Sequence, residues 1–417
     1  MKVLVVGSGG REHAIVWKLS RSSRVDKIYC APGNGGISEL AECLDIGVLD
    51  TESIIKACKD KNIDLVVVAP DDPLAMGMVN ELTKAGIRAF GPTREAALIE
   101  SSKSFSKSLM KKYGIPTAGF ETFDDVNKAM EYIRTQKYPL VVKADGLALG
   151  KGVIICNSEE EAREAVITIM ERKKFGDAGK VIVIEEFLTG QEVSILSFTD
   201  GKTIVPMVSA QDHKRVFDGD KGPNTGGMGA FSPSSVYTEK MAEICMNRIF
   251  RPTIEAMNKE GRTFKGVLYF GLIITEDGPR VLEYNARFGD PETQVVLPRL
   301  KNDLLDIIEA VIDERLDEIK IEWDDSACLC VIMASEGYPQ EYRKGLKITG
   351  LDSVEDDIIV FHAGTKKAGN EYFTNGGRVL GVTALGKSLK EARDKAYNAV
   401  SRIHFEGAHY RRDIGKF

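Results

Sequence analysis

A predicted strand and the turn after it carry the residues best suited to hold a metal ion. Alternation along a strand places Glu283, Asn285 and Arg287 on one face, with Leu282 and Tyr284 on the other. A carboxylate and an amide oxygen, completed by water and triphosphate oxygens, are what Mg²⁺ accepts in nucleotide sites. Arg287 beside them could hold a carboxylate or a transferring phosphoryl group. The pattern therefore indicates a metal and anion site, and an exposed polar strand face is the alternative.

A lysine followed by a glycine-rich loop indicates a phosphate site. Lys143 lies in a predicted strand, and a loop with Gly146, Gly150 and Gly152 leads to the next strand. In such a clamp the lysine reaches one phosphate oxygen while loop N–H groups fold over the others. The spacing is not that of a Walker A loop, which needs four residues before Gly-Lys and then Ser or Thr. We expect a lid that closes over a triphosphate, the alternative being an exposed hairpin with solvated lysines.

Paired acids at the end of another predicted strand could present backbone groups to an adenine ring. Glu185 and Glu186 are followed by Phe187 and Leu188, and Glu192 comes shortly afterwards. The apolar residues after the acids suit an adenine edge, and Glu192 could accept hydrogen bonds from ribose hydroxyls. The pattern alone also fits an ordinary edge strand with solvated acids. The neighbouring lysine clamp favours the nucleotide interpretation.

The first glycine-rich turn, at residues 7–13, has the form of an anion site. It leads from a strand into a helix start, where free backbone N–H groups attract anions. It is a poor dinucleotide fingerprint, because Glu12 occupies the third glycine position. A purely structural turn is the alternative to a phosphate-bearing substrate. The substrate-binding candidates here are Gly9, Gly10 and His13.

The segment at residues 211–229 is predicted to be a long polar loop. It combines consecutive basic side chains with a glycine nest, which favours anion binding over a plain mobile loop. The remaining histidines, His362, His404 and His409, have no supporting pattern and are expected to be structural. The substrate-binding candidates in this segment are Asp212, His213, Lys214, Arg215, Asn224, Thr225 and Gly226.

The elements that position these residues predict an α/β protein in three parts. Up to residue 100, short apolar strands alternate with amphipathic stretches, which indicates a parallel sheet with helices on both faces. We expect an N-terminal parallel-sheet domain (1–101), a central domain (102–325) with an α+β lid at about 118–188, and a small C-terminal α+β domain (326–417). Among the predicted elements are helices at 11–20, 51–61, 74–85, 103–113, 158–172, 239–259 and 389–404, and hairpins at 267–285 and around 375–377.

Composition excludes several classes of protein. The 417 residues are 43% apolar and 28% charged, which is typical of globular proteins. A net charge of −6 without a basic stripe disfavours nucleic acid as a partner. The longest apolar run, residues 327–334, is far short of the about 20 residues that span a bilayer, and no export signal is recognisable. Scattered cysteines without C-x-x-C pairs suit buried, reduced thiols. We expect a cytoplasmic monomer with no membrane partner.

Taken in order, the motifs resemble the ATP-grasp superfamily and, within it, the phosphoribosylamine–glycine ligase family. The resemblance covers the whole chain and implies a central ATP-grasp domain with a mobile lid. It also implies the second step of de novo purine (IMP) synthesis: ATP, glycine and 5-phosphoribosylamine give glycinamide ribonucleotide, ADP and phosphate through glycyl phosphate. The matching segments are residues 7–14, 32–34, 143–153, 212–215, 222–229 and 285–292.

The resemblance further implies roles for individual residues. Mg²⁺ or Mn²⁺ on Glu283 and Asn285 would offset the charge on the transferred phosphoryl group. Lys143, Arg287 and Asp290 would be catalytic, with Arg287 and Asp290 orienting glycine. The turn at 7–13 and the basic residues at 212–215 would hold the phosphoribosyl group. The implied ATP-binding residues are Lys103, Lys143, Gly150, Lys151, Glu185, Glu186, Leu188 and Glu192.

One departure and two alternatives limit this interpretation. Many ATP-grasp enzymes carry a further acidic metal ligand on the strand before Glu283, but Tyr269, Gly271 and Ile273 supply none. Another ATP-grasp carboxylate–amine ligase or a purine carboxylating enzyme would share the lysine clamp and the metal pair. A nucleotide-binding protein without catalysis would explain the glycines, but it would not need three polar groups on one strand face.

Overall fold

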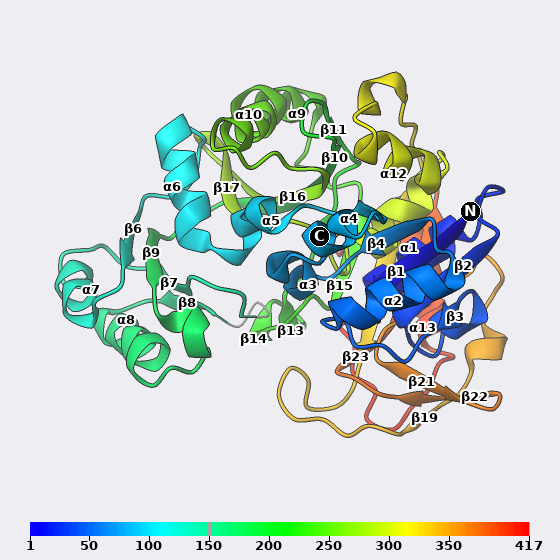
Figure 1. The fold of residues 1–417 in the computed structure, drawn as a ribbon. Coiled ribbons are helices and arrows are strands. Elements are labelled where there is room, and N and C mark those ends of the chain that lie inside the picture. Colours follow the sequence, from blue (N-terminus) through cyan, green and yellow to red (C-terminus); the bar gives the residue numbers. More distant parts are fainter. Residues whose placement is uncertain (149–151, 417) are drawn as a thin grey trace.

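The computed structural model describes residues 1–148 and 152–416. Its N-terminal part is a five-stranded parallel sheet in the order β3-β2-β1-β4-β5 (Figure 1). Val5 of β1 lies opposite Cys30 of β2 on one side and Val67 of β4 on the other. The predicted parallel sheet is therefore confirmed. Its strands are β1 (Lys2–Gly7), β2 (Lys27–Pro32), β3 (Glu42–Cys43), β4 (Leu65–Val68) and β5 (Arg88–Phe90).

Helices cover both faces of this sheet. Because strand residues alternate between faces, Val3 and Val5 join a core shared with α1 and α12, whereas Leu4 and Val6 join a core shared with α2, α3 and α4. The single helix predicted at 74–85 is wrong, since it breaks at Gly77, whose φ of +90° is left-handed. The helices are α1 (Gly10–Leu19), α2 (Thr51–Lys61), α3 (Asp71–Met76), α4 (Met78–Lys84), α5 (Arg94–Ser101) and, from much later in the chain, α12 (Leu304–Ile312).

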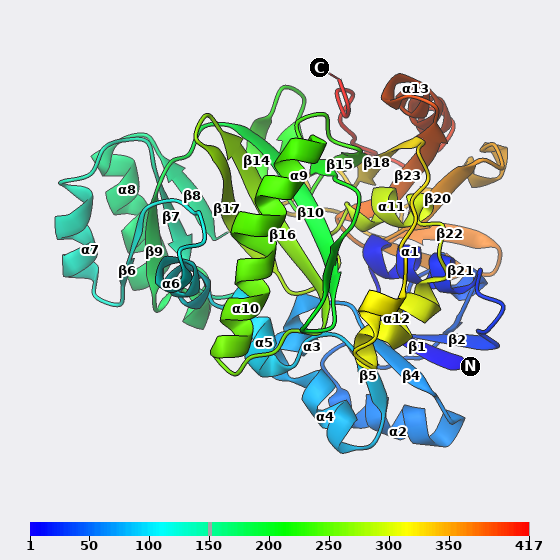
Figure 2. The same cartoon turned by 90° about the horizontal axis from the view of Figure 1, so that it is seen from above.

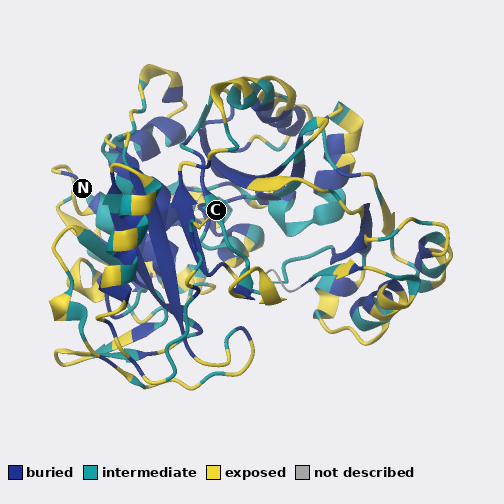
Figure 3. Cartoon of the chain, turned by 180° about the vertical axis from the view of Figure 1, so that it is seen from behind, coloured by how far each residue is buried: buried dark blue, intermediate teal, exposed yellow. Residues whose placement is uncertain are grey.

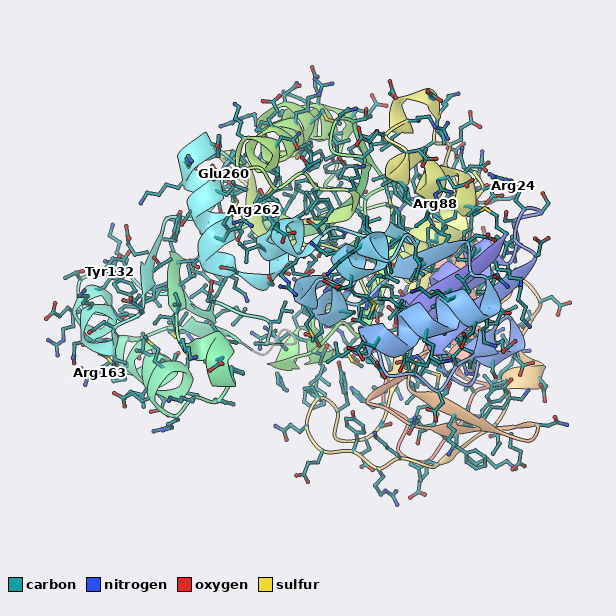
Figure 4. The ribbon with its side chains drawn as sticks, viewed as in Figure 1. Arg24, Arg88, Tyr132, Arg163, Glu260 and Arg262 are labelled. Atoms are coloured by element: carbon teal, nitrogen blue, oxygen red, sulfur yellow. The ribbon has the colours of Figure 1, made fainter. Side chains whose placement is uncertain are left out.

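Helix α12 is also held on the N-terminal sheet by charged side chains (Figure 4). Arg88 Nη1 lies 3.0 Å from Glu309 Oε1, and Arg24 Nη2 lies 2.6 Å from Glu309 Oε2. Partly exposed pairs of this kind stabilise by less than about 1 kcal/mol. The apolar contacts of α12 with the sheet therefore determine its position.

A second sheet, at residues 120–186, projects from the rest of the molecule (Figures 1 and 2). It is antiparallel, in the order β6-β9-β7-β8, and two helices enclose a separate core that includes Ile133, Val142 and Val166. The α+β unit predicted in this region is present. Helix α6 (Lys103–Tyr113) leads into it, and its elements are β6 (Phe120–Phe123), α7 (Val126–Ile133), β7 (Leu140–Ala144), β8 (Val153–Cys156), α8 (Glu159–Val166), extended by a π turn (Ile167–Glu171), and β9 (Ile182–Glu186).

A third, antiparallel sheet has the order β11-β10-β16-β17, and one long helix covers one of its faces (Figure 2). The helix stays continuous through a π turn (Met246–Phe250) that precedes Pro252, a residue without an N–H to donate. The hairpin predicted at 267–285 is confirmed. The elements are β10 (Gln191–Thr199), β11 (Ile204–Pro206), α9 (Glu239–Cys245), α10 (Arg251–Lys259), β16 (Gly266–Thr275) and β17 (Gly278–Asn285), followed by the short α11 (Thr293–Val296).

A further sheet, which joins strands of the central and C-terminal parts, and its surroundings correct two predictions. Residues 211–229 are not a loop, because they contain β12, β13 and β14, and β12 pairs with β15 at the edge of the sheet β12-β15-β18-β23-β20. The hairpin around 375–377 is wrong, because β22 pairs with β21 while β23 pairs with β18 and β20. The elements are β12 (Gln211–Asp212), β13 (Arg215–Phe217), β14 (Lys221–Asn224), β15 (Gly229–Ser232), β18 (Ala327–Ala334), β19 (Lys347–Ile348), β20 (Ile358–His362), β21 (Thr365–Ala368), β22 (Glu371–Thr374), β23 (Arg378–Gly386) and α13 (Leu389–Val400).

Buried strands run through all of these sheets, and exposed residues lie mainly on the outer helices and loops (Figure 3). All seven cysteines are free thiols, as expected, but Cys43 is exposed rather than buried. It lies on the edge strand β3, which no further strand covers. No helix in the described residues is long and apolar enough to cross a bilayer.

Candidate active site

Glu283 is the centre of a group of charged side chains on one face of the third sheet. Lys214 Nζ lies 3.6 Å from Glu283 Oε1 and 3.6 Å from Glu192 Oε2. Burial alone would raise the pKa of Glu283, but Lys214, Lys143 and Lys103 lower it below its ordinary value. The carboxylate is therefore anionic at neutral pH. Lysines from three separate segments of the chain converge on it.

The strand geometry explains why Glu283 and Asn285 share this face. The register places Glu283 opposite Gly271 and Asn285 opposite Tyr269, with a bulge at this point of the pairing. Tyr284 points to the other face, where its hydroxyl lies 3.0 Å from that of Thr253. A Cβ at position 271 would come within 3.0 Å of Glu283 Cγ. The strand before Glu283 therefore has little room for the further acid that the sequence lacks there.

Lys143 reaches this group from the projecting sheet. Its Nζ lies 3.0 Å from Glu185 Oε1 and donates to the carbonyl oxygen of Leu282 at 3.4 Å. Lys107, which the sequence analysis missed, lies 2.8 Å from the other oxygen of Glu185 and donates to Thr117 at 2.7 Å. Burial would raise the pKa of Glu185, but the two lysines lower it. Glu185 thus holds the clamp lysine in place.

Lys103 lies at the N-terminus of α6, next to the start of the glycine loop. Its ammonium donates to the carbonyl oxygen of Gly146 at 3.0 Å, and its backbone N–H donates to that of Asp145 at 3.1 Å. The carboxylate of Asp145 accepts in turn from the backbone N–H of Ser104 at 2.6 Å. Lys103 is therefore tied to the predicted clamp. Gly150 and Lys151 lie outside the described residues.

The predicted adenine-binding segment borders a pocket of about 590 Å³ between β9 and the β16–β17 hairpin. Glu186 and Leu188 both line it. The carboxylate of Glu186 is already used within the protein, since its Oε1 accepts from the backbone N–H of Gly119 at 2.8 Å and from Arg280 at 3.3 Å. The backbone N–H of Glu186 also donates within the protein, to the carbonyl oxygen of Gly119 at 2.9 Å, so Leu188 is the better candidate to meet a ligand here.

The structure separates the candidates of the 211–229 segment. Asp212 and Lys214 face the Glu283 group. Burial and the neighbouring acids outweigh the opposing effect of Lys214, so the pKa of Asp212 is raised to about 7. His213 points away, with its ring 5.9 Å from that of Phe231, and burial lowers its pKa to about 4. The guanidinium of Arg215 donates to the carbonyl oxygen of Gly222 at 2.7 Å. His213 and Lys214 lie between β12 and β13, so strand alternation does not account for this division.

Beyond the basic residues, the same segment makes a tight turn. Asn224 lies opposite Arg215 in the β13–β14 pair. Thr225 donates its hydroxyl to the carbonyl oxygen of Lys214 at 2.8 Å and accepts from the backbone N–H of Gly227 at 3.0 Å. Gly226 follows, with its N–H donating to the hydroxyl of Tyr338 at 3.0 Å. The predicted glycine nest is therefore a turn that rests on the C-terminal domain.

The first glycine turn is closed by its own side chains. Glu12 Oε2 accepts from the backbone N–H of Gly9 at 2.6 Å, and its Oε1 lies 2.6 Å from Arg11 Nε. A Cβ on Gly10 would come within 2.6 Å of Gln294 Nε2. Glu12 occupies the third glycine position of the dinucleotide fingerprint, and its carboxylate is the group that stabilises this turn.

His13 lies at the boundary with the C-terminal sheet. Its Nδ1 accepts a hydrogen bond from the backbone N–H of His362 at 2.7 Å, and its ring meets that of Phe361 edge-on at 5.7 Å. Burial and the neighbouring His362 lower the pKa of His13 to about 3. His13 is therefore neutral and joins two domains. Its Nδ1 is used by the hydrogen bond from His362.

Arg287 and Asp290 lie in a network of buried polar groups. Arg287 Nη2 lies 3.1 Å from Glu100 Oε1, and Glu100 Oε2 accepts from the backbone N–H of Ala286 at 2.7 Å. Asp290 Oδ1 accepts from Gln294 Nε2 at 2.7 Å, and Asp290 Oδ2 lies 2.9 Å from Arg378 Nη2. Two atoms of this network, Arg287 Nε and Gln294 Oε1, are buried without a hydrogen-bond partner in the described residues.

The sequence analysis missed Glu100, Gln294 and Arg378. Glu100 is a lone acid in a helix, and no local pattern distinguishes it. Gln294 follows the 285–292 motif by two residues, so extending the motif would have included it. Arg378 follows a glycine pair that was interpreted as a hairpin turn. In the described residues, no group of three or more His, Cys, Asp or Glu side chains forms a metal site.

Comparison with known proteins gives consistent matches along the chain. Three family models match: phosphoribosylglycinamide synthetase N domain at residues 1–100, its ATP-grasp (A) domain at 101–293, and its C domain at 328–417. The phosphoribosylamine–glycine ligase of Caldanaerobacter subterraneus subsp. tengcongensis is 50% identical over 414 residues, 99% of each chain.

Solved structures show the same arrangement. The crystal structure of phosphoribosylamine–glycine ligase from Thermotoga maritima is similar with a TM-score of 0.86 and 35% identity, covering 99% of this chain and 100% of that one. The biotin carboxylase domain of Hydrogenobacter thermophilus 2-oxoglutarate carboxylase has a TM-score of 0.75 at 16% identity, covering 98% and 91% of the two chains. This second likeness shows a shared fold alone.

Proposed function

The chain belongs to the phosphoribosylglycinamide synthetase family, and from this membership we propose that the Glu283 group and the Arg287–Asp290 network form one active site. The reaction is the ATP-dependent ligation of glycine to 5-phosphoribosylamine, the second step of purine synthesis. It gives glycinamide ribonucleotide, ADP and phosphate.

The residues around Glu283 fit a nucleotide with a divalent cation. Glu283 and Asn285 offer the hard carboxylate and amide oxygens that Mg²⁺ prefers, and Mn²⁺ accepts the same ligands. The lowered pKa of Glu283 keeps it anionic for this purpose. When bound, the cation supplies charge neutralisation for the triphosphate. Lys103 and Lys143 add two positive charges on the side of the projecting sheet, where the γ-phosphoryl group would pass.

The observation that carries the assignment of glycine is the pair of buried atoms without partners. Arg287 Nε is a donor and Gln294 Oε1 is an acceptor, and Gln294 binds the carboxylate of Asp290 through its Nε2 at 2.7 Å. A zwitterionic amino acid offers a carboxylate to the donor and an ammonium to the acceptor and to Asp290. Buried polar groups require partners, so a ligand of this kind would satisfy both. We assign the carboxylate of glycine to Arg287 and its ammonium to Asp290.

The chemistry then needs positioning rather than an enzyme nucleophile. The carboxylate of glycine takes the γ-phosphoryl group of ATP to give glycyl phosphate. The amine of 5-phosphoribosylamine attacks the acyl carbon, and phosphate leaves. We assign the phosphoribosyl group to the Gly9–Gly10 turn, through the backbone N–H of Gly10, and to Lys214; the N–H of Gly9 already donates to Glu12. Excluding water protects the acyl phosphate, and holding the reactants in place lowers the barrier.

A coupled ADP-release assay with each substrate omitted in turn tests this function. We expect release only when ATP, glycine and 5-phosphoribosylamine are all present, because glycyl phosphate has no other good acceptor in a closed site. Rapid ADP release with glycine alone would contradict this sequence of steps. Release that depends on bicarbonate instead of glycine would show a carboxylating enzyme. Cytoplasmic location, the monomeric state and the three domain boundaries stay predictions.

A further inference from the structure

Arg378, at the start of β23 in the C-terminal domain, binds two separate parts of the active site. Its Nη1 donates to the carbonyl oxygens of Gly226 at 2.6 Å, Asp290 at 2.9 Å and Gly227 at 3.4 Å. Its Nη2 lies 2.9 Å from Asp290 Oδ2. One planar guanidinium thus joins the 226–227 turn to the main chain and side chain of Asp290. A lysine ammonium, which is a single point charge, lacks the fork needed to span these acceptors.

The 226–227 turn is shaped to receive this guanidinium. A Cβ on Gly226 would lie 3.0 Å from Arg378 Cζ, so a side chain there would push against it. Gly227 has a φ of +113°, a conformation that favours glycine. Tyr338, also in the C-terminal domain, accepts from the N–H of Gly226 at 3.0 Å. The turn is therefore held from two sides by the C-terminal domain.

Both carboxylate oxygens of Asp290 have fixed partners. Oδ1 accepts from Gln294 and Oδ2 pairs with Arg378. Burial would raise the pKa of Asp290, and Arg378 and Arg11 lower it below its ordinary value. Without Arg378, a mostly buried carboxylate would lose its main compensating charge and one of its two anchors. Such a group shifts towards its neutral form.

We propose that Arg378 is a positioning residue for the amino acid substrate. It keeps Asp290 ionised and oriented to receive the ammonium of glycine, and it fixes the neighbouring turn. The C-terminal domain thereby contributes to amino acid binding, although nothing in its sequence pattern indicates a substrate site. The inference rests on the proposed function, in which Asp290 binds the ammonium group.

The test compares Arg378→Gln and Arg378→Lys with Arg393→Gln as a matched control. Arg393, on α13 of the same domain, also donates to backbone carbonyl oxygens, those of Ile414 at 3.2 Å and Arg412 at 2.9 Å. We expect Arg378→Gln to raise KM for glycine at least about tenfold, with KM for ATP changing less than about twofold. Arg378→Lys should lie between Arg378→Gln and the unmodified chain, because one charge remains. The control should leave both KM values unchanged.

A pH profile separates positioning from a merely structural role. In Arg378→Gln, Asp290 should be protonated at lower pH, because the compensating charge is lost. The value of kcat/KM for glycine should therefore rise with pH through the neutral range, as Asp290 loses this proton. The double variant Asp290→Asn/Arg378→Gln should bind glycine no more weakly than Asp290→Asn alone, since Arg378 acts through Asp290. If Arg378→Gln does not fold, Arg378→Lys and the double variant provide the same comparison.

The result that overturns the inference is an unchanged KM for glycine in folded Arg378→Gln or, where that variant does not fold, in Arg378→Lys. Additive effects of the Asp290 and Arg378 changes would also overturn it. If the unmodified chain releases ADP without glycine, the proposed function fails instead. The two failures are distinguishable in one assay series.

Discussion

The two ends of the proposed active site are built from different interactions. At the nucleotide end, which we define as Lys103, Lys143, Glu185, Lys214 and Glu283, charged side chains pair with one another, as Lys143 does with Glu185 and Lys214 with Glu283. Ion pairs of this kind can exchange their partners for phosphate oxygens or a cation. This end is therefore suited to charge that changes during the reaction.

At the phosphate-loop end, which we define as residues 7–13 with Asn34 and His362, side chains bind the main chain. Glu12 accepts from the N–H of Gly9, His13 accepts from that of His362, and Asn34 Nδ2 donates to the carbonyl oxygens of Ser8 at 2.8 Å and His362 at 2.9 Å. These bonds hold the turn in a fixed shape, in which the N–H groups of Gly9 and His362 are already used within the protein. The nucleotide end therefore depends on charge, whereas the phosphate-loop end depends on a rigid backbone.

The largest expected effect is at the nucleotide end. Replacing Glu283→Gln together with Asn285→Ala should lower kcat at least about 1000-fold, because it removes both proposed metal ligands. Lys214 and Glu283 side chains are 35% and 37% exposed, so losing their pair should change Tm by less than about 4 °C. Steady-state kinetics and thermal denaturation measure both quantities.

The control for this variant is Glu255→Gln, at an exposed position of α10 outside the pocket, which should leave both quantities unchanged. An unfolded double variant would contradict the comparison, since the polar face would then be structural.

An intermediate effect distinguishes the two lysines on Glu185. Lys143→Met should lower kcat about 100-fold, because Lys143 alone of the pair also reaches the β17 strand that carries Glu283. Lys107→Met should instead lower the free energy of unfolding by about 3 kcal/mol while kcat changes less than about threefold, because Lys107 is only 2% exposed and binds Thr117.

Chemical denaturation and turnover are measured for both variants. The control is Lys111→Met, an exposed position on the same helix. Equal losses of turnover in Lys107→Met and Lys143→Met would contradict the view that Lys143 acts in turnover while Lys107 only stabilises the fold.

The smallest effect concerns pH at the phosphate-loop end. His13 has a pKa of about 3 in the folded protein and about 6.5 when unfolded. Above pH 6.5, His13 is neutral in both states, so its titration does not change the free energy of unfolding. As the pH falls from 6.5 towards 3, the unfolded chain binds a proton that the folded protein refuses, so stability falls by about 1.4 kcal/mol per pH unit.

His13→Asn should remove this part of the slope, measured as the free energy of unfolding between pH 6.5 and 4.5. The control is the exposed His404→Asn, which should keep the slope of the unmodified chain. A slope in His13→Asn equal to that of the unmodified chain would show that the interdomain hydrogen bond does not depend on a neutral His13.

Much of the fold follows from local pattern, and the exceptions have physical reasons. Strand alternation correctly separates Glu283 and Asn285 from Tyr284, and the Asp-Gly turn correctly predicts the β16–β17 hairpin. The segment at 211–229 was predicted as a loop because its strands are short and polar; they form only by pairing with β15 or with each other. Composition alone does not reveal such pairing.

The sequence by itself determined which residues are candidates to hold phosphate, metal and amino acid, because glycine turns, paired acids and alternating polar groups have local causes in backbone conformation and strand periodicity. Only the tertiary structure decided which of them act together. His13 meets His362 across 349 residues, and Arg378 meets Asp290 across 88. Contacts at such separation depend on how whole sheets pack, so they decide that His13 joins two domains, that His213 points away, and that Glu100, Gln294 and Arg378 contact Arg287 or Asp290.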